Sequence, residues 1–379
     1  DTVVLNESTA RELGVDVGDT VTVRLPVEQA VPADSPLGRR DIQSEGLPRM
    51  KVVDVVADRG LGRFSLAPSQ AAPQNIYLSR QTIGDALERV GQANALLFDQ
   101  PITSDDLQID LADFGLTLER VRQEFKEESG ATRLIYDYYS LTSERLLLPE
   151  VAVDRIRDQF DASEVAAACT YLANAIERLD ESGEVIASVP YSTITAIDST
   201  TSLPLNYTRP GNGDGQRIPI VLNSWAAERL DATVGTELRV AYYEPEVESG
   251  KEIERYFDAV VTDIVPITKP ATPYRRTREA SFDSPPTVYN DPNLTPTVPG
   301  VTDQDSISDW DLPFPLQRKI DNEDDLYWNE YRLTPKAFLP LSEGQALFGS
   351  RFGQTTGLRF SADVADDIEA LQQLSLIHI

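Results

Sequence analysis

An internal repeat constrains the fold of this chain more than any other feature. The segment "VVLNESTARELGVDVGDTVTVRL" (residues 3–25) aligns without a gap on "IVLNSWAAERLDATVGTELRVAY" (residues 220–242). Eight aligned positions are identical: Val4/Val221, Leu5/Leu222, Asn6/Asn223, Ala10/Ala227, Leu13/Leu230, Val17/Val234, Gly18/Gly235 and Val23/Val240. A local pattern that recurs in this way indicates two related structural units.

The repeated block predicts a strand, a short helix, a turn and a second strand. Asn6 and Asn223 are placed to accept hydrogen bonds from the first free N–H groups of the helix, so we interpret them as N-caps and not as ligands. Ala10 and Leu13 share one face of the helix. Gly18 supplies the turn before an alternating strand.

Two further blocks follow in the same order in each copy. "VVDVVAD" (52–58) and "VTDIVPI" (261–267) are apolar runs typical of buried strands. Residues 76–98 and 337–360 then share Leu78/Leu341, Ser79/Ser342, Gly91/Gly353, Gln92/Gln354, Leu96/Leu358 and Phe98/Phe360. We expect each serine to cap a helix and each glycine to end it before another strand. The predicted fold class is α+β, with two related mixed α/β units, a tandem duplication, joined by a strand-hairpin and helix segment.

The segment between the copies, residues 101–217, has a different character. Residues 116–148 read as strands on either side of the polar turn 126–130. An amphipathic helix is predicted next, because apolar residues recur at i, i+3 and i+4 spacing: Val165, Ala168, Cys169, Leu172, Ile176 and Leu179. Cys169, the single cysteine, lies on the apolar face and is interpreted as a packed thiol, not a reactive one.

The second copy carries a long insertion, residues 269–335, rich in proline and acidic residues. Disordered tracts are poor in aromatic residues. This insertion contains Trp310, Phe314, Tyr327, Trp328 and Tyr331, so we predict an ordered excursion held by these rings.

Charge and composition exclude several classes of function. Lys and Arg number 34 against 62 Asp and Glu, a net charge of −28, which argues against binding to nucleic acid. One cysteine excludes an intrachain disulfide framework. The sequence has no apolar run of the ~18–20 residues that span a bilayer. Because it opens within a predicted strand, "DTVVLNES", we expect a piece of a longer protein.

The only histidine, His378, lies in the tail "LSLIHI" (374–379). This tail matches the translation of a transposase adapter used in sequencing libraries, so we interpret it as probable read-through and exclude it from the fold. A genuine apolar strand end is the alternative. Without the tail the segment has no histidine, which excludes Ser-His-Asp, Cys-His and His-ligated zinc sites within it.

Three other stretches have some features of binding sites. Asp303, Asp305, Asp309, Asp311 and residues 321–325 could gather around Ca²⁺, but they do not match the EF-hand spacing. "GNGDG" (211–215) lacks the Lys and Ser/Thr of a phosphate loop and favours a turn. "PYRRTRE" (273–279) favours pairing with the protein's own carboxylates over binding phosphate. No catalytic residue, cofactor ligand or metal ligand is predicted.

The ordered blocks resemble a known family. "VVLNESTARELGVDVGDTVTVR", "KVVDVVAD" and "NIYLSRQTIGDALERVGQANALLF" are similar to the extracytoplasmic domain of FtsX-like/MacB-like ABC transporter permeases. "DDLYWNEYRLTPKAFLPLSEGQALFGSRFG" resembles the large-loop branch of that family. The resemblance covers most of residues 1–373 and is weakest near 100–150.

The resemblance implies a first MacB-like unit at 1–100, a connecting segment at 101–217 and a second unit at 218–373. It implies a non-catalytic permease subunit at the periplasmic face of the bacterial cytoplasmic membrane, anchored by helices outside this fragment. Implied partners are a cytoplasmic ABC ATPase, a second permease in a dimeric assembly, and an envelope lipoprotein, lipid, peptide or protein. No cofactor is implied.

Two other functions stay open at this point. One is a soluble extracytoplasmic module that binds a ligand or protein through the aromatic insertion, without a role in transport. The other is an enzyme, because "LGVDVGDTVTVRL" also looks like a piece of the double-psi barrels found in metal-dependent oxidoreductases.

Overall fold

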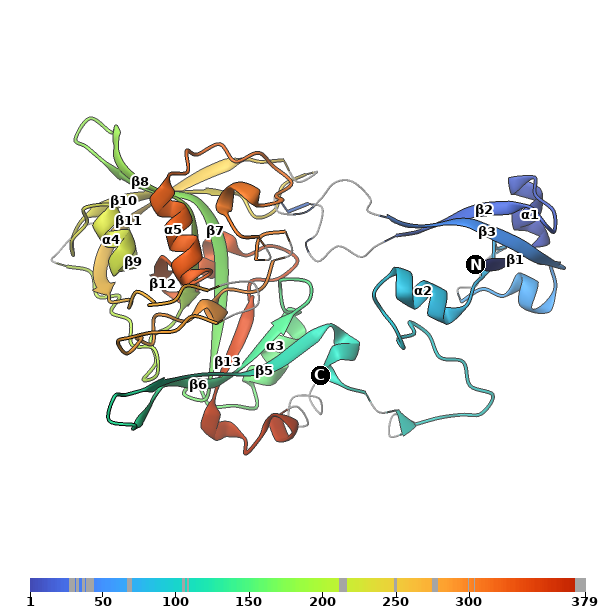
Figure 1. Ribbon diagram of the computed structural model, residues 1–379, viewed down its shortest axis with the longest axis horizontal. Coiled ribbons are helices and arrows are strands. Elements are labelled where there is room, and N and C mark those ends of the chain that lie inside the picture. The colour runs from blue at the N-terminus through green and yellow to red at the C-terminus, as the bar shows by residue number, and fades with distance from the viewer. Residues whose placement is uncertain are drawn as a thin grey trace. The chain divides into compact units, whose positions relative to one another are not determined.

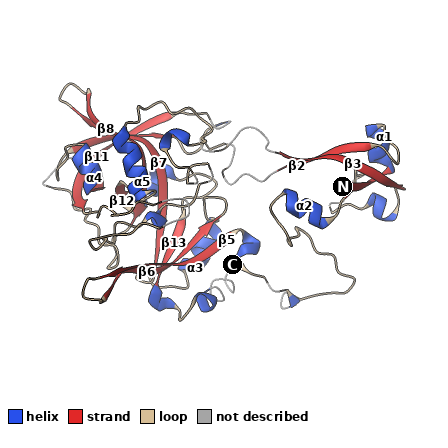
Figure 2. Cartoon of the chain, in the orientation of Figure 1, coloured by secondary structure: helices blue, strands red, loops and turns tan. Residues whose placement is uncertain are grey.

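The computed structural model describes residues 1–26, 31, 34–35, 38, 44–66, 70–103, 106–107, 109–210, 217–248, 251–274, 279–298, 300–302 and 304–371. The fold is mixed α/β, as the sequence predicts. Strands account for 34% and helices for 20%, so sheets carry the architecture (Figure 2).

The chain divides into two compact units. Unit 1 comprises Asp1–Gln29 and Asp41–Leu107, and unit 2 comprises Ala30–Arg40 and Gln108–Ile379. Because residues 30–40 belong to unit 2, the chain passes between the units three times. The predicted connecting segment, 101–217, falls almost entirely within unit 2.

Unit 1 is built on a four-stranded sheet with the order β2-β3-β1-β4 (Figure 1). Its elements are β1 (Thr2–Asn6), α1 (Glu7–Leu13), β2 (Thr20–Pro26), β3 (Ser44–Val56), η1 (Gly60–Arg63), β4 (Ile76–Tyr77) and α2 (Arg80–Ala86). β1 runs parallel to β3 and antiparallel to β4, and β2 runs antiparallel to β3. Alternating residues of the strands, such as Val3 and Leu5, form the core with Ala10 of α1.

Unit 2 contains a nine-stranded sheet with the order β10-β11-β9-β12-β8-β7-β13-β6-β5 (Figure 1). Its strands are β5 (Leu116–Lys126), β6 (Thr132–Ser143), β7 (Val165–Leu179), β8 (Val185–Ile197), β9 (Ile218–Asn223), β10 (Glu237–Tyr243), β11 (Glu254–Val265), β12 (Ala337–Leu339) and β13 (Gly357–Ser361). Its helices are η3 (Leu111–Phe114), α3 (Glu150–Arg157), α4 (Ser224–Arg229), η5 (Pro292–Leu294), η6 (Ile307–Asp309), α5 (Asn322–Tyr331), α6 (Leu341–Phe348) and η7 (Ala362–Val364).

Four strands of unit 2 repeat the connectivity of unit 1. The order β10-β11-β9-β12 matches β2-β3-β1-β4, and each strand pair has the same relative direction as its counterpart. In unit 2 this set is closed into a six-stranded barrel, because β8 pairs with β12 and β7 pairs with both β8 and β10.

The two copies agree in local detail as well. Asn6 and Asn223 are the N-caps of α1 and α4, and each side chain accepts from the backbone N–H three residues on, as predicted. Gly18 and Gly235 have φ values of 105° and 94°, which favour glycine. Each glycine N–H donates to a strand carbonyl at 2.8 Å, that of Val52 or Val261. The sequence therefore predicts the cap and the turn correctly in both copies.

Matched apolar residues differ in exposure between the units. Leu13 is 53% exposed whereas Leu230 is fully buried, and Phe98 is 51% exposed whereas Phe360 is fully buried. The strand expected near Leu96 and Phe98 is absent from the described part of unit 1, whereas its counterpart β13 lies between β6 and β7. The described part of unit 1 has no counterparts of β6 and β7, so residues 96–98 have no neighbouring strands with which to form backbone hydrogen bonds.

The predicted serine caps are correct in position for one helix only. Ser79 is the N-cap residue of α2, but its side chain makes no capping hydrogen bond. Ser342 lies inside α6, whose N-cap is Pro340. The prediction for Ser342 is wrong because the helix begins earlier, at Leu341, directly after Pro340. Pro340 has an extended backbone and no N–H to donate, so it lies just before the first turn of the helix.

The connecting segment contains the predicted hairpin, β5–β6, around the turn at 126–130. The amphipathic helix predicted over residues 165–179 is wrong: these residues form β7. Both faces of β7 are covered, which explains why it contains many small apolar residues. The helix-like spacing of its apolar residues is therefore a coincidence. Its backbone groups pair with β8 on one edge and with β13 and then β10 on the other, and this pairing overrides local helix propensity.

Cys169 lies inside this strand and offers a first test of the fold. It is 2% exposed, and burial raises the pKa of its thiol to about 12. We expect a disulfide reagent at about pH 8 to label the native protein far more slowly than the urea-unfolded protein, because only the thiolate reacts. Fast labelling of the native protein, followed by absorbance, would contradict the placement of β7.

Candidate functional site

The insertion packs against the barrel through aromatic rings. Trp310, Phe314, Tyr327, Trp328 and Tyr331 are all buried, which confirms the prediction of an ordered excursion. Trp310 packs edge-on against Trp328 with ring centroids 5.1 Å apart, and Tyr191 of β8 joins this cluster. Phe314 contacts Tyr243 of β10 at 4.9 Å. The rings therefore attach the insertion to two barrel strands.

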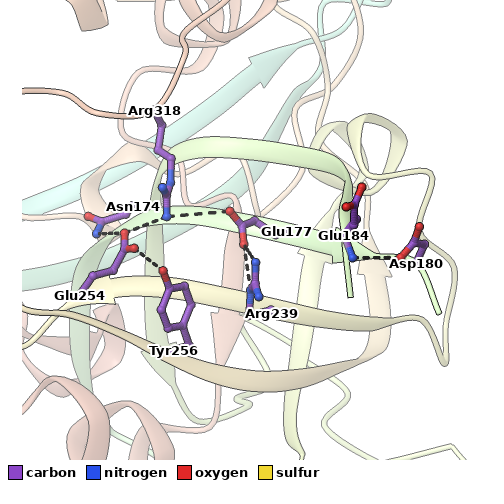
Figure 3. Close-up of polar contacts among 8 residues, drawn as sticks. All are labelled: Asn174, Glu177, Asp180, Glu184, Arg239, Glu254, Tyr256 and Arg318. Atoms are coloured by element: carbon purple, nitrogen blue, oxygen red, sulfur yellow. Dashed lines mark hydrogen bonds and ion pairs between the residues drawn. The ribbon is translucent and has the colours of Figure 1, made fainter. Parts of the chain in front are cut away.

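A network of charged side chains lies beside these rings (Figure 3). Glu177 of β7 accepts from Arg239 of β10 at 2.7 and 3.0 Å. Arg318 of the insertion donates to Glu254 of β11 at 2.8 Å and lies 3.9 Å from Glu177. It therefore joins two barrel carboxylates to the insertion. Its backbone N–H also donates to the hydroxyl of Tyr191 at 2.8 Å.

Neutral donors complete the environment of Glu254. The Asn174 amide donates to its carboxylate at 2.9 Å, and the Tyr256 hydroxyl donates to the other oxygen (Figure 3). Burial raises the pKa of Glu254, but these two hydrogen bonds and the Arg318 charge together hold it below its usual value. Each charged group in the network has an opposite partner, so the arrangement is suited to positioning the insertion and not to proton transfer.

Asp180 and Glu184 close the β7–β8 hairpin near the network (Figure 3). The Asp180 carboxylate accepts from the Glu184 N–H at 3.0 Å and from the Ser182 N–H at 2.8 Å. These bonds hold the tight turn that aligns the two barrel strands.

Lys336, the residue directly after the insertion, is buried beneath it. Its ammonium group lies 5.1 Å from the ring centre of Trp225 and 4.9 Å from that of Tyr327, and it donates to the Pro190 carbonyl at 3.3 Å. Burial lowers the pKa of Lys336 to about 8, although the charge of Asp324 opposes this shift. Sequence reasoning missed Lys336, because nothing in "TPKAF" distinguishes a buried lysine from an exposed one.

Asn223 connects the insertion to the repeated block. Besides capping α4, its amide donates to the Tyr327 hydroxyl at 2.9 Å and to the Pro335 carbonyl at 3.0 Å. In unit 1 the Asn6 amide donates instead to the carbonyls of Gly62 and Pro73. In both units, therefore, the asparagine caps the helix and also binds the loop that leads to the next strand, β4 in unit 1 and β12 in unit 2.

Several of the acidic residues that could gather around Ca²⁺ serve instead as caps, hydrogen-bond acceptors and ion-pair partners. Asp321 caps α5 and pairs with Arg229 at 2.7 Å, and Glu323 pairs with the same arginine at 2.8 Å. Asp325 accepts from the Ser306 hydroxyl at 3.0 Å, and Asp305 lies 3.7 Å from Arg332. Across the described part of the chain, no three His, Cys, Asp or Glu side chains are placed to hold a metal ion.

Other predicted stretches are only partly visible. "GNGDG" (211–215), residues 275–278 of "PYRRTRE", Asp303 and the tail 374–379 lie outside the described residues. Among the helices that the structure describes, none is long and apolar enough to cross a bilayer. Comparison of the chain with protein-family models gives no match, and comparison with curated protein sequences gives none either.

The Arg318 network gives a second testable prediction. We expect Arg318→Ala to speed amide exchange across residues 312–320 and to cost about 1–2 kcal/mol of unfolding free energy, because two carboxylates lose a partner. Arg255→Ala is the matched control: it removes a solvent-exposed pair with Glu244 and should cost less than about 0.5 kcal/mol. Equal exchange in both variants, measured by mass spectrometry, would mean that the network does not hold the insertion.

Proposed function

We propose that this chain is the extracytoplasmic domain of an FtsX-like/MacB-like ABC transporter permease. In this role it has no catalytic activity of its own. A separate ATPase in the cytoplasm hydrolyses ATP, and transmembrane helices outside the fragment transmit the motion to this domain. The domain then acts on an envelope lipoprotein, lipid, peptide or protein at the periplasmic face of the membrane.

One observation carries the proposal. The sequence blocks on which the resemblance rests occur twice in the same order, and in each set four strands have the same order and relative directions, with a capping asparagine after the first. This agreement supports a tandem duplication of one βαβ-plus-strands unit. The segment between the copies contributes two hairpins, β5–β6 and β7–β8, and the short helix α3.

The ordered insertion is compatible with the proposed role. It is the part that most distinguishes the second copy, and it is fixed to the barrel by rings and paired charges. A surface that is held rigidly can pass a displacement to a partner with little loss. The same rigidity would also suit a soluble binding module, which is the second candidate.

The native gene distinguishes the two candidates. Sequencing past both ends should find long apolar segments before Asp1 and after residue 373, with the last six codons replaced by other sequence. Stop codons or soluble domains in those places would refute the permease assignment and favour the binding module. Calorimetry with ATP should give no saturable binding to this chain, and clear binding would count against the permease assignment.

A further inference from the structure

The sheet of unit 1 is half of a barrel, and strands β2 and β4 form its two edges. Within the described part of the unit, each of these strands pairs on one side only, β2 with β3 and β4 with β1. An edge strand presents a row of unpaired N–H and C=O groups to which another strand can add. The half-barrel therefore offers two places for strand addition.

Unit 2 shows what fills the same two edges in the related copy. There β10, the counterpart of β2, pairs with β7, and β12, the counterpart of β4, pairs with β8. β7 and β8 form one antiparallel hairpin, which closes the barrel. This hairpin comes from the segment between the copies, and the described part of unit 1 has no counterpart of either strand.

Apolar residues of unit 1 are exposed where their counterparts in unit 2 lie against this hairpin. Leu13 is 53% exposed, whereas the matched Leu230 is fully buried and its carbonyl accepts from Arg178 of β7 at 3.0 Å. Ile76 of β4 is 42% exposed. Ala337, at the same register position of β12, is fully buried where that strand pairs with β8.

The third repeated block indicates the same missing neighbour. Leu358 and Phe360 are buried in β13, which pairs with β7. Their counterparts Leu96 and Phe98 are 60% and 51% exposed. Three separate parts of unit 1, namely the end of α1, the edge strand β4 and residues 96–98, therefore expose apolar groups at positions that adjoin β7 or β8 in unit 2.

The charge on β2 indicates one property of the strand that would fit beside it. Arg24 is exposed and aligns with Ala241 of β10, which lies opposite Ala175 of β7. Opposite charges at directly opposed positions of neighbouring strands stabilise the pair. A strand that fits β2 is therefore expected to carry an acidic residue at the position of Ala175.

We propose that unit 1 binds a β-hairpin of another protein, which adds one strand to β2 and one to β4 and so closes the half-barrel. The hairpin has apolar residues toward the core of unit 1, as Ala173 and Ile176 have in unit 2, and an acidic residue opposite Arg24. A second copy of this chain fits less well, because its own β7–β8 hairpin is held along both edges in unit 2 and two chains of net charge −28 repel each other. The inference does not rest on the proposed transport role.

The test uses the full chain and a hairpin peptide as the probe. The peptide comprises residues 170–197, which omits Cys169, and carries Ala175→Glu to match Arg24. Fluorescence anisotropy of the labelled peptide should show saturable binding to the chain. The same peptide with Ala175→Pro should bind at least tenfold more weakly, because proline removes a backbone donor and interrupts the strand.

Cys169 labelling shows which unit the peptide occupies. Labelling should stay slow in the presence of the peptide, because the β7–β8 hairpin of unit 2 is not displaced. Fast labelling would mean that the peptide replaces this hairpin in the closed barrel, and it would contradict binding at unit 1.

Variants of the full chain locate the binding at the open side of unit 1. Leu13→Asp should weaken peptide binding at least tenfold, because a charge then lies at the apolar end of α1. Val17→Asp is the matched control: Val17 is 59% exposed, and its counterpart Val234 is 53% exposed even beside the closed barrel, so binding should not change. Amide exchange in β1 and β3 reports whether unit 1 is folded in each variant.

Several other outcomes would overturn the proposal. These are no saturable binding of the peptide to the unaltered chain, equal binding of the Ala175→Pro peptide, and undiminished binding to a folded Leu13→Asp chain. A dimer of the unaltered chain in sedimentation that Leu13→Asp dissolves would assign the two edges to a second copy instead. The first two outcomes need no variant of the chain, so the proposal can fail even if Leu13 proves essential for folding.

Discussion

Replacing Asn223 by alanine should cost about 3–5 kcal/mol of the unfolding free energy of unit 2. The side chain is fully buried and makes three hydrogen bonds, to the Ala226 N–H, the Tyr327 hydroxyl and the Pro335 carbonyl. Alanine leaves the Ala226 N–H and the Pro335 carbonyl buried without these partners. Urea unfolding followed by Cys169 labelling reports the loss directly, because Cys169 lies in the barrel.

Asn6→Ala is the matched substitution in unit 1. Asn6 is also fully buried and caps α1 in the same way, so its loss should destabilise unit 1. It should leave the Cys169 labelling curve of unit 2 unchanged, since the two side chains act in separate units. If Asn223→Ala shifts that curve no more than Asn6→Ala does, the asparagine does not secure the insertion.

The second large effect is an unusual rise of stability with pH. We expect Lys336 to contribute an increase of up to about 3 kcal/mol in the unfolding free energy between about pH 8 and 10. The pKa of Lys336 is about 8 in the folded protein and 10.5 when unperturbed. Between these values the unfolded chain binds the extra proton, so raising the pH favours the folded state.

The Cys169 thiol and buried tyrosines limit this rise at its upper end. Burial raises the pKa of Cys169 to about 12 and also raises the pKa of Tyr138, Tyr207 and Tyr327, so these groups stay neutral in the folded protein while they ionise in the unfolded chain. Above about pH 9 that difference favours unfolding. The unfolding free energy should therefore pass through a maximum near pH 9, and the Lys336 contribution is the difference between the unaltered protein and Lys336→Met.

Lys336→Met should remove the rise, because methionine fills the same space between Trp225 and Tyr327 without a proton to lose. Lys269→Met is the control, since Lys269 is an exposed lysine paired with Glu330, and it should keep the rise. Urea titrations at several pH values measure both. If the unfolding free energy of Lys336→Met still rises with pH, a group other than Lys336 causes the rise.

The features that could be predicted from sequence are local ones. Asn6 and Asn223 were recognisable as caps, and Gly18 as a turn, because each acts on backbone within a few residues. The aromatic residues of the insertion also predicted its order correctly, since rings at that density are rarely left in water.

β7 could not be predicted, because its environment outweighs its local pattern. Ala166, Ala168 and Ala173 favour a helix in isolation, and the apolar spacing fits one. The strand forms because β8, β10 and β13 offer backbone partners along both edges. Those partners lie up to 195 positions away, beyond the reach of a window along the sequence.

The candidate site was equally hidden. Arg239 and Glu177 are 62 positions apart, Arg318 and Glu254 are 64 apart, and Asn174 and Glu254 are 80 apart. Charged residues are abundant in this acidic chain, so no local signal marks the ones that meet.

The three passages of the chain between the units have a consequence for limited proteolysis. A protease that cuts only between residues 99 and 108 leaves residues 30–40 on the same fragment as unit 1, although these residues belong to unit 2. The two fragments are then no longer joined covalently, but the contacts of Asp34 with Val247 and Arg351 can still hold them together. We therefore expect the two fragments to separate in denaturant but to elute together under native conditions, until a second cut between β2 and β3 frees them.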